Sequence, residues 1–370
     1  MSNTLPLAAL GRLGQSVWLD SISREWIVSG ELAQMVADLS ITGLTSNPTI
    51  FAAALHSSVY DDAIADLIHQ GCDDRTIFER LAVEDIRSAC DILRDVWKVS
   101  AGLDGMVSIE LEPDLAHDTV GSTRRARELW HLVDRPNVMI KVPATEAGMD
   151  VVHELVTDGI NVNVTLLFSV GAYRDVMDRY LSALEQRLAS GDHLAVHSVA
   201  SFFISRIDTA VDAALDGTTG TDHLRGKIAV ANALAAWDAY LEVFTSDRFL
   251  TLQRAGARPQ RPLWASTGTK NAAYSDILYV QELIAAGSVN TMPLATMQAF
   301  QDHGTAQVTV TEAARRQAQA LLGDLRGSGV NLDAITEQLR TDGVAAFEQS
   351  YRELLARIAD RRTAMGPPPA

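Results

Sequence analysis

Residues 138–143 read Val-Met-Ile-Lys-Val-Pro, an apolar and β-branched run interrupted by one lysine. Such a run is typical of a strand that is covered on both faces, as in a parallel sheet. Lys141 is unusual there, because a lysine is rarely fully buried and burying its charge is costly. Desolvation lowers the pKa of a lysine, and a neutral amine in an apolar pocket condenses with a ketone to form a Schiff base. Alternatively, Lys141 ends an edge strand and extends its head into water.

Similar β-like runs lie on both sides of this stretch and alternate with helical segments. Strands are predicted at residues 17–22, 41–46, 105–111, 138–143, 160–167, 197–202, 262–267 and 288–293. This alternation implies parallel strands joined by right-handed crossovers. Eight such units favour a closed α/β barrel of the (β/α)8 TIM type. An open doubly wound sheet is the alternative, but no Gly-x-Gly-x-x-Gly motif follows the first strand.

The strand signal ends near residue 301, and helices are predicted beyond it over residues 311–325 and 333–362. We therefore predict a catalytic barrel domain over residues 1–305 and C-terminal helices packed on the barrel over residues 306–362. Residues 363–370, which end in Gly-Pro-Pro-Pro-Ala, are predicted to be a disordered tail. Near the start of the chain, one helix is predicted over residues 23–37.

The composition excludes several classes of protein. The 370 residues are 47% hydrophobic and 21% charged, which is typical of a soluble globular chain, and they contain no apolar run long enough for a membrane span. Residues 1–10 lack the basic start and apolar core of a signal peptide. The net charge of −16 opposes binding to nucleic acid or to an anionic membrane. The two cysteines, Cys72 and Cys90, form no disulfide framework or metal motif, which favours the cytoplasm.

Polar side chains gather near the ends of the predicted strands, where barrel enzymes carry their active sites. Because side chains alternate along a strand, residues two apart share a face. The sets predicted to face the lumen are Trp18 with Asp20, Ser108 with Glu110, Met139 with Lys141, Asn161 with Asn163 and Thr165, and Trp264 with Ser266, while Asn47 closes the second strand. Each set has an ordinary explanation, such as a helix cap, a turn or a rim ion pair. One convergent site explains all of them together.

These residue types suit chemistry at a lysine imine. Asp20 and Glu110 can move protons on the carbinolamine and on substrate hydroxyls during C–C cleavage. Asn47 and Asn163 can hold sugar hydroxyls, and Thr165 can position a water.

A phosphate group would be bound by Arg206 and Lys270, with Ser266 as an additional donor. Arg206 lies near the predicted start of a helix, where the helix dipole favours an anion. The overall acidity of the chain makes such a local positive site necessary for an anionic substrate.

Five motifs resemble, in their order along the chain, those of the transaldolase family. They are Gly-Leu-Thr-Ser-Asn-Pro-Thr at 43–49, Val-Ser-Ile-Glu at 107–110, Ile-Lys-Val-Pro-Ala-Thr at 140–145, Gly-Ile-Asn-Val-Asn-Val-Thr-Leu-Leu-Phe-Ser at 159–169, and Ser-Phe-Phe-Ile-Ser-Arg at 201–206. The resemblance covers roughly residues 14–303 and implies an eight-stranded barrel without a metal or an organic cofactor. The chain beyond residue 303 is similar to the longer bacterial type of the family.

The implied reaction is transfer of a dihydroxyacetone unit from a ketose phosphate to an aldose phosphate in the non-oxidative pentose phosphate pathway. The implied substrate pairs are sedoheptulose 7-phosphate with glyceraldehyde 3-phosphate, and fructose 6-phosphate with erythrose 4-phosphate. The partners are therefore phosphorylated ketoses and aldoses, with no nucleic acid and no membrane. The oligomeric state, monomer or homodimer, stays open.

The resemblance also implies a role for each matching residue. Lys141 forms the imine, Asp20 is the acid/base for C–C cleavage, and Glu110 acts in imine formation through a water held by Thr165. The implied substrate-binding residues are Asn47, Asn163, Ser201, Phe203 and Arg206, joined by Ser266 and Lys270.

The chain departs from the family pattern in two places. Many members carry Ser-Phe-Arg after strand seven, where this chain has Ala-Ser-Thr-Gly-Thr-Lys at 265–270, so Lys270 is expected to replace the arginine as phosphate ligand. Many members also carry Ser-Pro-Phe where Ser201, Phe202 and Phe203 stand here.

Two alternative functions are considered. The first is a fructose-6-phosphate aldolase that releases free dihydroxyacetone; those relatives are shorter and usually have glutamine at the position of Glu110 and tyrosine at that of Phe203. The second is a sugar-phosphate-binding barrel without catalysis, which the presence of Asp20, Glu110 and Lys141 together argues against.

Overall fold

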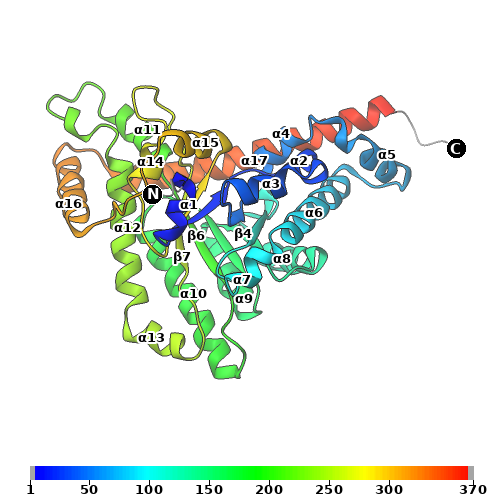
Figure 1. The fold of residues 1–370 in the computed structure, drawn as a ribbon, viewed down its shortest axis with the longest axis horizontal. Helices are drawn as coiled ribbons and strands as arrows, with labels where there is room; N and C mark the ends of the chain where they lie inside the picture. Colours follow the sequence, from blue (N-terminus) through cyan, green and yellow to red (C-terminus); the bar gives the residue numbers. More distant parts are fainter. Residues whose placement is uncertain (1–4, 366–370) are drawn as a thin grey trace.

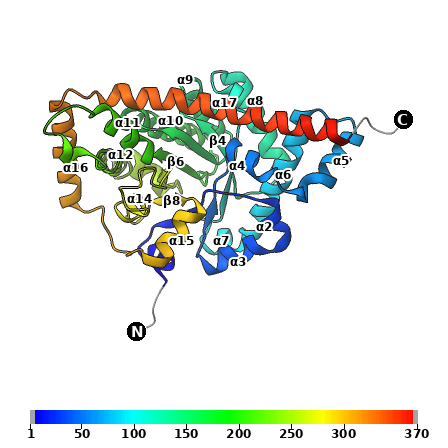
Figure 2. The same cartoon turned by 90° about the horizontal axis from the view of Figure 1, so that it is seen from above.

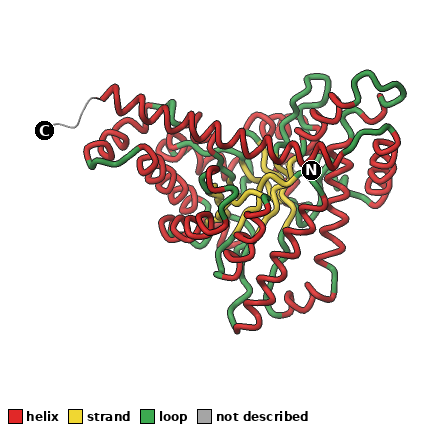
Figure 3. The backbone as a smooth tube through the Cα atoms, turned by 180° about the vertical axis from the view of Figure 1, so that it is seen from behind, coloured by secondary structure: helices red, strands yellow, loops and turns green. Residues whose placement is uncertain are grey.

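Eight parallel strands form a closed barrel in the computed structural model, which describes residues 5–365. They are β1 (Ser16–Leu19), β2 (Gly43–Leu44), β3 (Met106–Glu110), β4 (Val138–Pro143), β5 (Val162–Leu167), β6 (Ser198–Phe203), β7 (Arg261–Ala265) and β8 (Val289–Met292). Each strand pairs with the next in sequence, and β1 pairs with β8 to close the ring. Figure 3 shows the strands at the centre of the molecule with helices around them. The predicted TIM-type barrel is confirmed, and the open sheet is wrong.

The helices surround the strands and extend beyond them (Figure 1). They are α1 (Pro6–Arg12), α2 (Arg24–Ser29), α3 (Glu31–Asp38), α4 (Pro48–Ala54), α5 (Asp61–His69), α6 (Asp74–Ile92), α7 (Arg94–Val99), α8 (Thr119–Val133), α9 (Glu146–Thr157), α10 (Val170–Ser190), α11 (Ser205–Ala214), α12 (Ile228–Phe244), α13 (Asp247–Arg254), α14 (Leu278–Gln281), α15 (Leu294–His303), α16 (Glu312–Gly327) and α17 (Leu332–Met365). Short 3-10 helices span Ser58–Tyr60, Pro113–Leu115 and Asp222–Leu224. Several helices begin at a side-chain cap; Thr145, for example, accepts a hydrogen bond from Gly148 N at 3.0 Å.

Some local predictions are corrected by the structure. The helix predicted over residues 23–37 is broken into α2 and α3 at Gly30, whose φ of 81° is left-handed. The strand predicted over residues 41–46 pairs only at Gly43 and Leu44. Just beyond the paired residues, the Ser46 hydroxyl donates to the Ser108 carbonyl, and the Ser46 carbonyl accepts from Lys141.

A buried ion pair fills the N-terminal end of the barrel. Arg261, 5% exposed, donates to the Asp104 carboxylate at 3.1 Å. Asp104 also accepts hydrogen bonds from Ser16 and from the indole nitrogen of Trp18. Trp18 leaves no room for a side chain at Gly43, where a Cβ atom would lie 2.4 Å from the indole ring. This end is therefore packed, and the chemistry is left to the opposite end.

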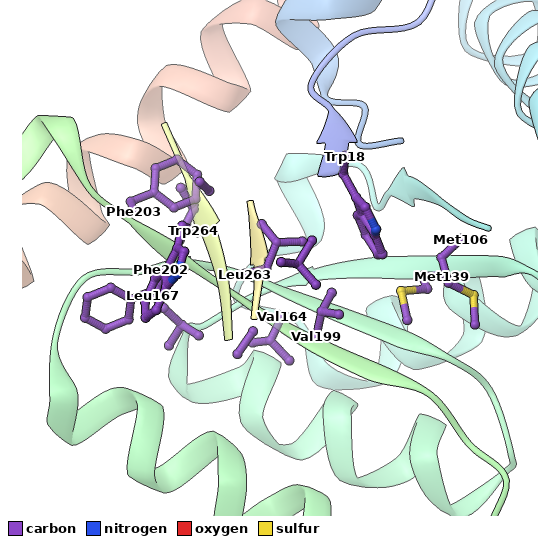
Figure 4. Packing of buried hydrophobic residues seen from close by; sticks show 14 of the residues in the cluster. Trp18, Met106, Met139, Val164, Leu167, Val199, Phe202, Phe203, Leu263 and Trp264 are labelled. Atoms are coloured by element: carbon purple, nitrogen blue, oxygen red, sulfur yellow. The ribbon is translucent and has the colours of Figure 1, made fainter. Parts of the chain in front are cut away.

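Trp264 faces the helix layer, so the prediction that it points into the lumen is wrong. Its ring lies 6.3 Å from Phe202 and 6.5 Å from Trp237 of α12, and Figure 4 shows Trp264 and Phe202 side by side. The register pairs Phe202 with Trp264, and Ser201 with Leu263. Ser266 follows in a left-handed conformation with φ of 55°, which ends the regular alternation of faces.

The long helix α17 crosses the whole molecule over one end of the barrel, as seen in Figure 2. Its distal half is held by ion pairs from Arg361 to Asp61 at 2.9 Å and from Arg362 to Asp74 at 2.8 Å. Because α17 continues to Met365, the tail predicted over residues 363–370 starts within its last turn, and residues 366–370 lie outside the described part. Within residues 5–365, no helix combines the length and apolarity that a bilayer crossing requires.

Candidate active site

Lys141 lies inside the barrel near the C-terminal end of β4. Its side chain is 5% exposed, and its ammonium nitrogen donates to the Glu110 carboxylate and to the Ser46 carbonyl, both at 3.2 Å. The sheet register explains the pairing, because Glu110 of β3 lies directly beside Lys141 of β4. The alternative in which the lysine head reaches water at a sheet edge is therefore wrong.

Glu110 is a buried carboxyl group with an unusual pKa. Loss of solvent raises the pKa of Glu110 to about 7, although the attraction of Lys141 works in the opposite direction. The negative charge of Asp20 adds to the upward shift, which places Asp20 within electrostatic reach. A carboxyl group that titrates near neutral pH can both accept and return a proton during a reaction.

Asp20 lies just after β1 and is partly exposed. Its carboxylate accepts a hydrogen bond from the Thr45 hydroxyl at 2.6 Å, and Thr45 also contacts the Thr291 hydroxyl at 2.7 Å. The carboxylate is thus oriented by its neighbours while it stays accessible from the barrel mouth.

A row of hydrogen-bonded polar side chains crosses β3, β5 and β6. Asn163, which has no exposed surface, donates to the Ser108 hydroxyl at 2.9 Å. Ser201 donates to the side-chain oxygen of Asn163 at 2.6 Å. Asn163 lies beside Lys141 in the register, so this row borders the amine and presents polar groups to a hydroxylated ligand.

Thr165 lies on the same face of β5 as Asn163 and is fully buried. Its hydroxyl has no hydrogen-bond partner among the described residues. Leaving a buried hydroxyl unpaired costs about 1–3 kcal/mol, so this position suits a bound water or a substrate hydroxyl.

Asn47 caps helix α4 by accepting a hydrogen bond from Ile50 N at 3.0 Å. The cap explains its position after β2, and it leaves the amide NH2 group of Asn47 available as a donor.

Arg206 and Phe203 form the cationic side of the barrel mouth. Arg206 is the second residue of α11, and its guanidinium lies 5.8 Å from the centre of the Phe203 ring. No carboxylate in residues 5–365 forms an ion pair with it, and burial lowers its pKa. A desolvated guanidinium without a counter-ion at a helix N-terminus is suited to bind a phosphate.

The two remaining predicted phosphate ligands lie after β7. The Ser266 hydroxyl is 2.9 Å from that of Ser205, the residue before Arg206, so Ser266 lies at the N-terminus of α11. Lys270 is exposed on the loop that follows, and no interaction in the described structure joins it to Arg206. The structure thus brings Ser266 to the N-terminus of the helix that carries Arg206, whereas Lys270 shares only the same end of the barrel.

Two contributors to the site were not predicted. The Ser46 carbonyl bonds the lysine but is a backbone group that has no sequence signature. Phe347 of α17 places its ring 5.7 Å from the Lys141 nitrogen. A helical apolar residue so distant in sequence carries no local sign of such a contact.

The chain is similar to known proteins over nearly its whole length. The family described as Transaldolase/Fructose-6-phosphate aldolase matches residues 17–358. A protein of Saccharopolyspora erythraea named transaldolase is 46% identical over 363 residues, covering 98% of this chain and 99% of the relative. Transaldolase 1 of Streptomyces coelicolor is 48% identical, covering 96% and 95%. A transaldolase of Mycobacterium tuberculosis is also 48% identical, covering 94% and 95%. The chain therefore belongs to the transaldolase/fructose-6-phosphate aldolase family.

Proposed function

We propose that this protein is a transaldolase that moves a dihydroxyacetone unit between phosphorylated sugars through a Schiff base on Lys141. The observation that carries the proposal is the buried contact of 3.2 Å between the Lys141 amine and the Glu110 carboxylate. Asp20 is close enough for its charge to raise the pKa of Glu110. The names of the relatives support the same activity over nearly the full chain.

The first half of the reaction builds the imine. After Lys141 gives a proton to Glu110, its neutral amine attacks the ketone carbon of the donor sugar, and the resulting carbinolamine loses water. Glu110, with its pKa near 7, accepts and returns the protons of this step, through a water held by the Thr165 hydroxyl.

The second half breaks and remakes a C–C bond. Asp20 removes the proton from the hydroxyl at C4, the C3–C4 bond breaks, and the aldose phosphate leaves. The Asn163–Ser201 pair, together with Asn47, holds the hydroxyls of the unit that stays on the lysine, and Arg206 with Ser266 binds the phosphate. Lys270 is the second cation for phosphate in this proposal.

The closest competing activity is that of a fructose-6-phosphate aldolase, since the family includes both. A carboxylate at Glu110 and a phenyl ring at Phe203, where such aldolases usually carry glutamine and tyrosine, favour the transferase. The substrates are those implied by the resemblance, namely sedoheptulose 7-phosphate with glyceraldehyde 3-phosphate and fructose 6-phosphate with erythrose 4-phosphate. The cytoplasmic location and a monomeric or homodimeric state stay predictions from the sequence.

A coupled assay tests the proposal. With fructose 6-phosphate and erythrose 4-phosphate together, the wild type should form sedoheptulose 7-phosphate, and Lys141→Ala should form none. Borohydride in the presence of the donor should add the mass of the reduced three-carbon unit at Lys141. Rapid turnover of fructose 6-phosphate without any acceptor would instead identify an aldolase, and full activity of Lys141→Ala would remove the lysine from the mechanism.

A further inference from the structure

Phe347 of α17 covers the amine on which the proposed reaction depends. The ring centre lies 5.7 Å from the Lys141 nitrogen, and Phe347 is only 7% exposed. An aromatic face interacts favourably with a cation at this distance, and it cannot donate a proton as a water could. The contact comes from a helix that is not part of the barrel.

The approach of α17 depends on a matched pair of backbone features. Gly343, one helical turn before Phe347, lies against Leu166, where a Cβ atom would stand 2.9 Å from the leucine side chain. Leu166 has a left-handed φ of 59°, at the point where the pairing of β5 with β6 shifts register. The bulge and the glycine together let the helix lie close enough for Phe347 to reach the lysine.

The cavities between α17 and Glu110 are very small. Two cavities lie here, and Glu110 lines both. The first, of about 10 Å³, is also lined by Leu166, Val344 and Phe347. The second, of about 20 Å³, is lined by Tyr351 of α17 as well. A single water needs roughly 10–15 Å³. By contrast, four substrate-side residues are only partly buried: Asp20, Asn47, Arg206 and Ser266. On the side of Glu110 that α17 covers, these cavities hold at most isolated waters.

We propose that Phe347 is a specificity-determining residue that keeps water from the three-carbon unit on Lys141, so that the unit passes to an acceptor aldose and is not released as free dihydroxyacetone. This inference rests on the proposed transaldolase function. It goes beyond that function because it assigns the choice between transfer and release to a residue of the C-terminal helix.

The two outcomes differ in one chemical step. After the C3–C4 bond breaks, its electron pair stays with the three-carbon unit, which is an enamine on the Lys141 nitrogen. In transfer, C3 attacks the acceptor aldehyde, whose oxygen takes the proton held by Asp20, and one water then hydrolyses the imine to free the ketose. In release, C3 takes a proton from water, and the hydroxide left behind completes hydrolysis of the imine to dihydroxyacetone and the free amine. Water near the enamine thus promotes release.

Three variants test the role of the ring: Phe347→Ala opens space beside the amine, Phe347→Leu keeps an apolar group there, and Ile358→Ala is the control. Ile358 is also buried on α17, 1% exposed, but it lies three turns beyond Phe347 and does not contact the site. Two rates are measured for each protein: free dihydroxyacetone from fructose 6-phosphate alone, and sedoheptulose 7-phosphate when erythrose 4-phosphate is added. The ratio of release to transfer is the readout.

We expect Phe347→Ala to raise the ratio at least about tenfold, equivalent to ~1.4 kcal/mol of barrier difference. Phe347→Leu should raise it less, and Ile358→Ala should leave it at the wild-type value. The inference is overturned if both Phe347 variants keep the wild-type ratio, or if Ile358→Ala raises it as much as Phe347→Ala. Should Phe347→Ala fail to fold, the ratio of release to transfer in Phe347→Leu is compared with that in Ile358→Ala, and this comparison decides. Absence of transfer by the wild type would contradict the proposed function itself, which separates the two failures.

Discussion

The pair formed by Lys141 and Glu110 shows how the chemistry is set by single residues. Both side chains are 5% exposed, and they meet at 3.2 Å across neighbouring strands. Burial of a carboxylate favours its neutral form, and the nearby ammonium only partly offsets this, so the pKa of Glu110 is raised from 4.5 to about 7. The residue is thus held in the range where proton exchange is easiest near neutral pH.

The raised pKa of Glu110 predicts how stability depends on pH. Between about pH 4.5, where the group titrates in the unfolded chain, and about pH 7, the folded state binds more protons than the unfolded state. Stability contributed by this group therefore falls as pH rises through that window. Between pH 5 and pH 7.5, the free energy of unfolding of Glu110→Gln should fall less steeply than that of the wild type. Urea titration at each pH measures it. Identical slopes for the two proteins would contradict the pKa assignment.

Arg206 should govern recognition of the phosphate group. Hydrogen bonds to charged groups contribute about 1.5–3 kcal/mol, so Arg206→Ala should lower kcat/KM for fructose 6-phosphate by about 10- to 100-fold. Reaction with unphosphorylated fructose, measured in the same assay, should change little. Arg254→Ala, an exposed arginine at the end of α13, is the matched control and should behave as wild type. Equal losses with both sugars would show that Arg206 does not read the phosphate.

Among the elements, α11 is tied to its neighbours by two aspartates one turn apart. Asp208 is buried, and it accepts hydrogen bonds from the Tyr279 hydroxyl at 3.0 Å and from Ala229 N at 2.7 Å. Asp212 accepts from the Tyr274 hydroxyl at 2.5 Å. These bonds connect the helix that carries Arg206 to the segment after β7 that carries Lys270.

Loss of the buried hydrogen bond between Tyr279 and Asp208 should destabilise the protein. Tyr279→Phe leaves the Asp208 carboxylate, whose pKa burial raises to about 6, with one donor fewer in a buried place. We expect a decrease of about 1.5–3 kcal/mol in the free energy of unfolding, measured by urea denaturation. Tyr274→Phe removes the same group nearer to solvent and should cost less. A larger effect of Tyr274→Phe would reverse this ranking.

On the scale of the whole molecule, α17 joins parts of the barrel that are far apart in sequence. Ion pairs fasten its distal half to α5 and α6, and its middle lies on the bulge of β5. The barrel and α17 therefore meet at the site itself, where Phe347 contacts Lys141.

The close contact between Gly343 of α17 and Leu166 of β5 predicts an unusual effect of replacing this glycine. Leucine favours a helix by about 1 kcal/mol over glycine, but at Gly343 it would collide with Leu166, and overpacking costs about 1–3 kcal/mol. Gly343→Leu should thus unfold at lower urea concentration than wild type. Gly323 in α16 has open space around it, so Gly323→Leu should be neutral or stabilising in the same titration. Stabilisation by both changes would mean that α17 does not pack against β5 at Gly343 as described.

The amino-acid sequence by itself determined the barrel and most of the candidate site, because strand and helix periodicity is local and parallel strands bring their C-terminal ends together. Asp20, Glu110, Lys141 and Asn163 could be placed in this way, whereas Ser201 was named only from the resemblance to the family. Only the tertiary structure decided that Trp264 faces the helices, that Ser266 is set by a left-handed bend, and that Phe347 covers the lysine. Those features depend on packing between residues far apart in the chain, which no local pattern records.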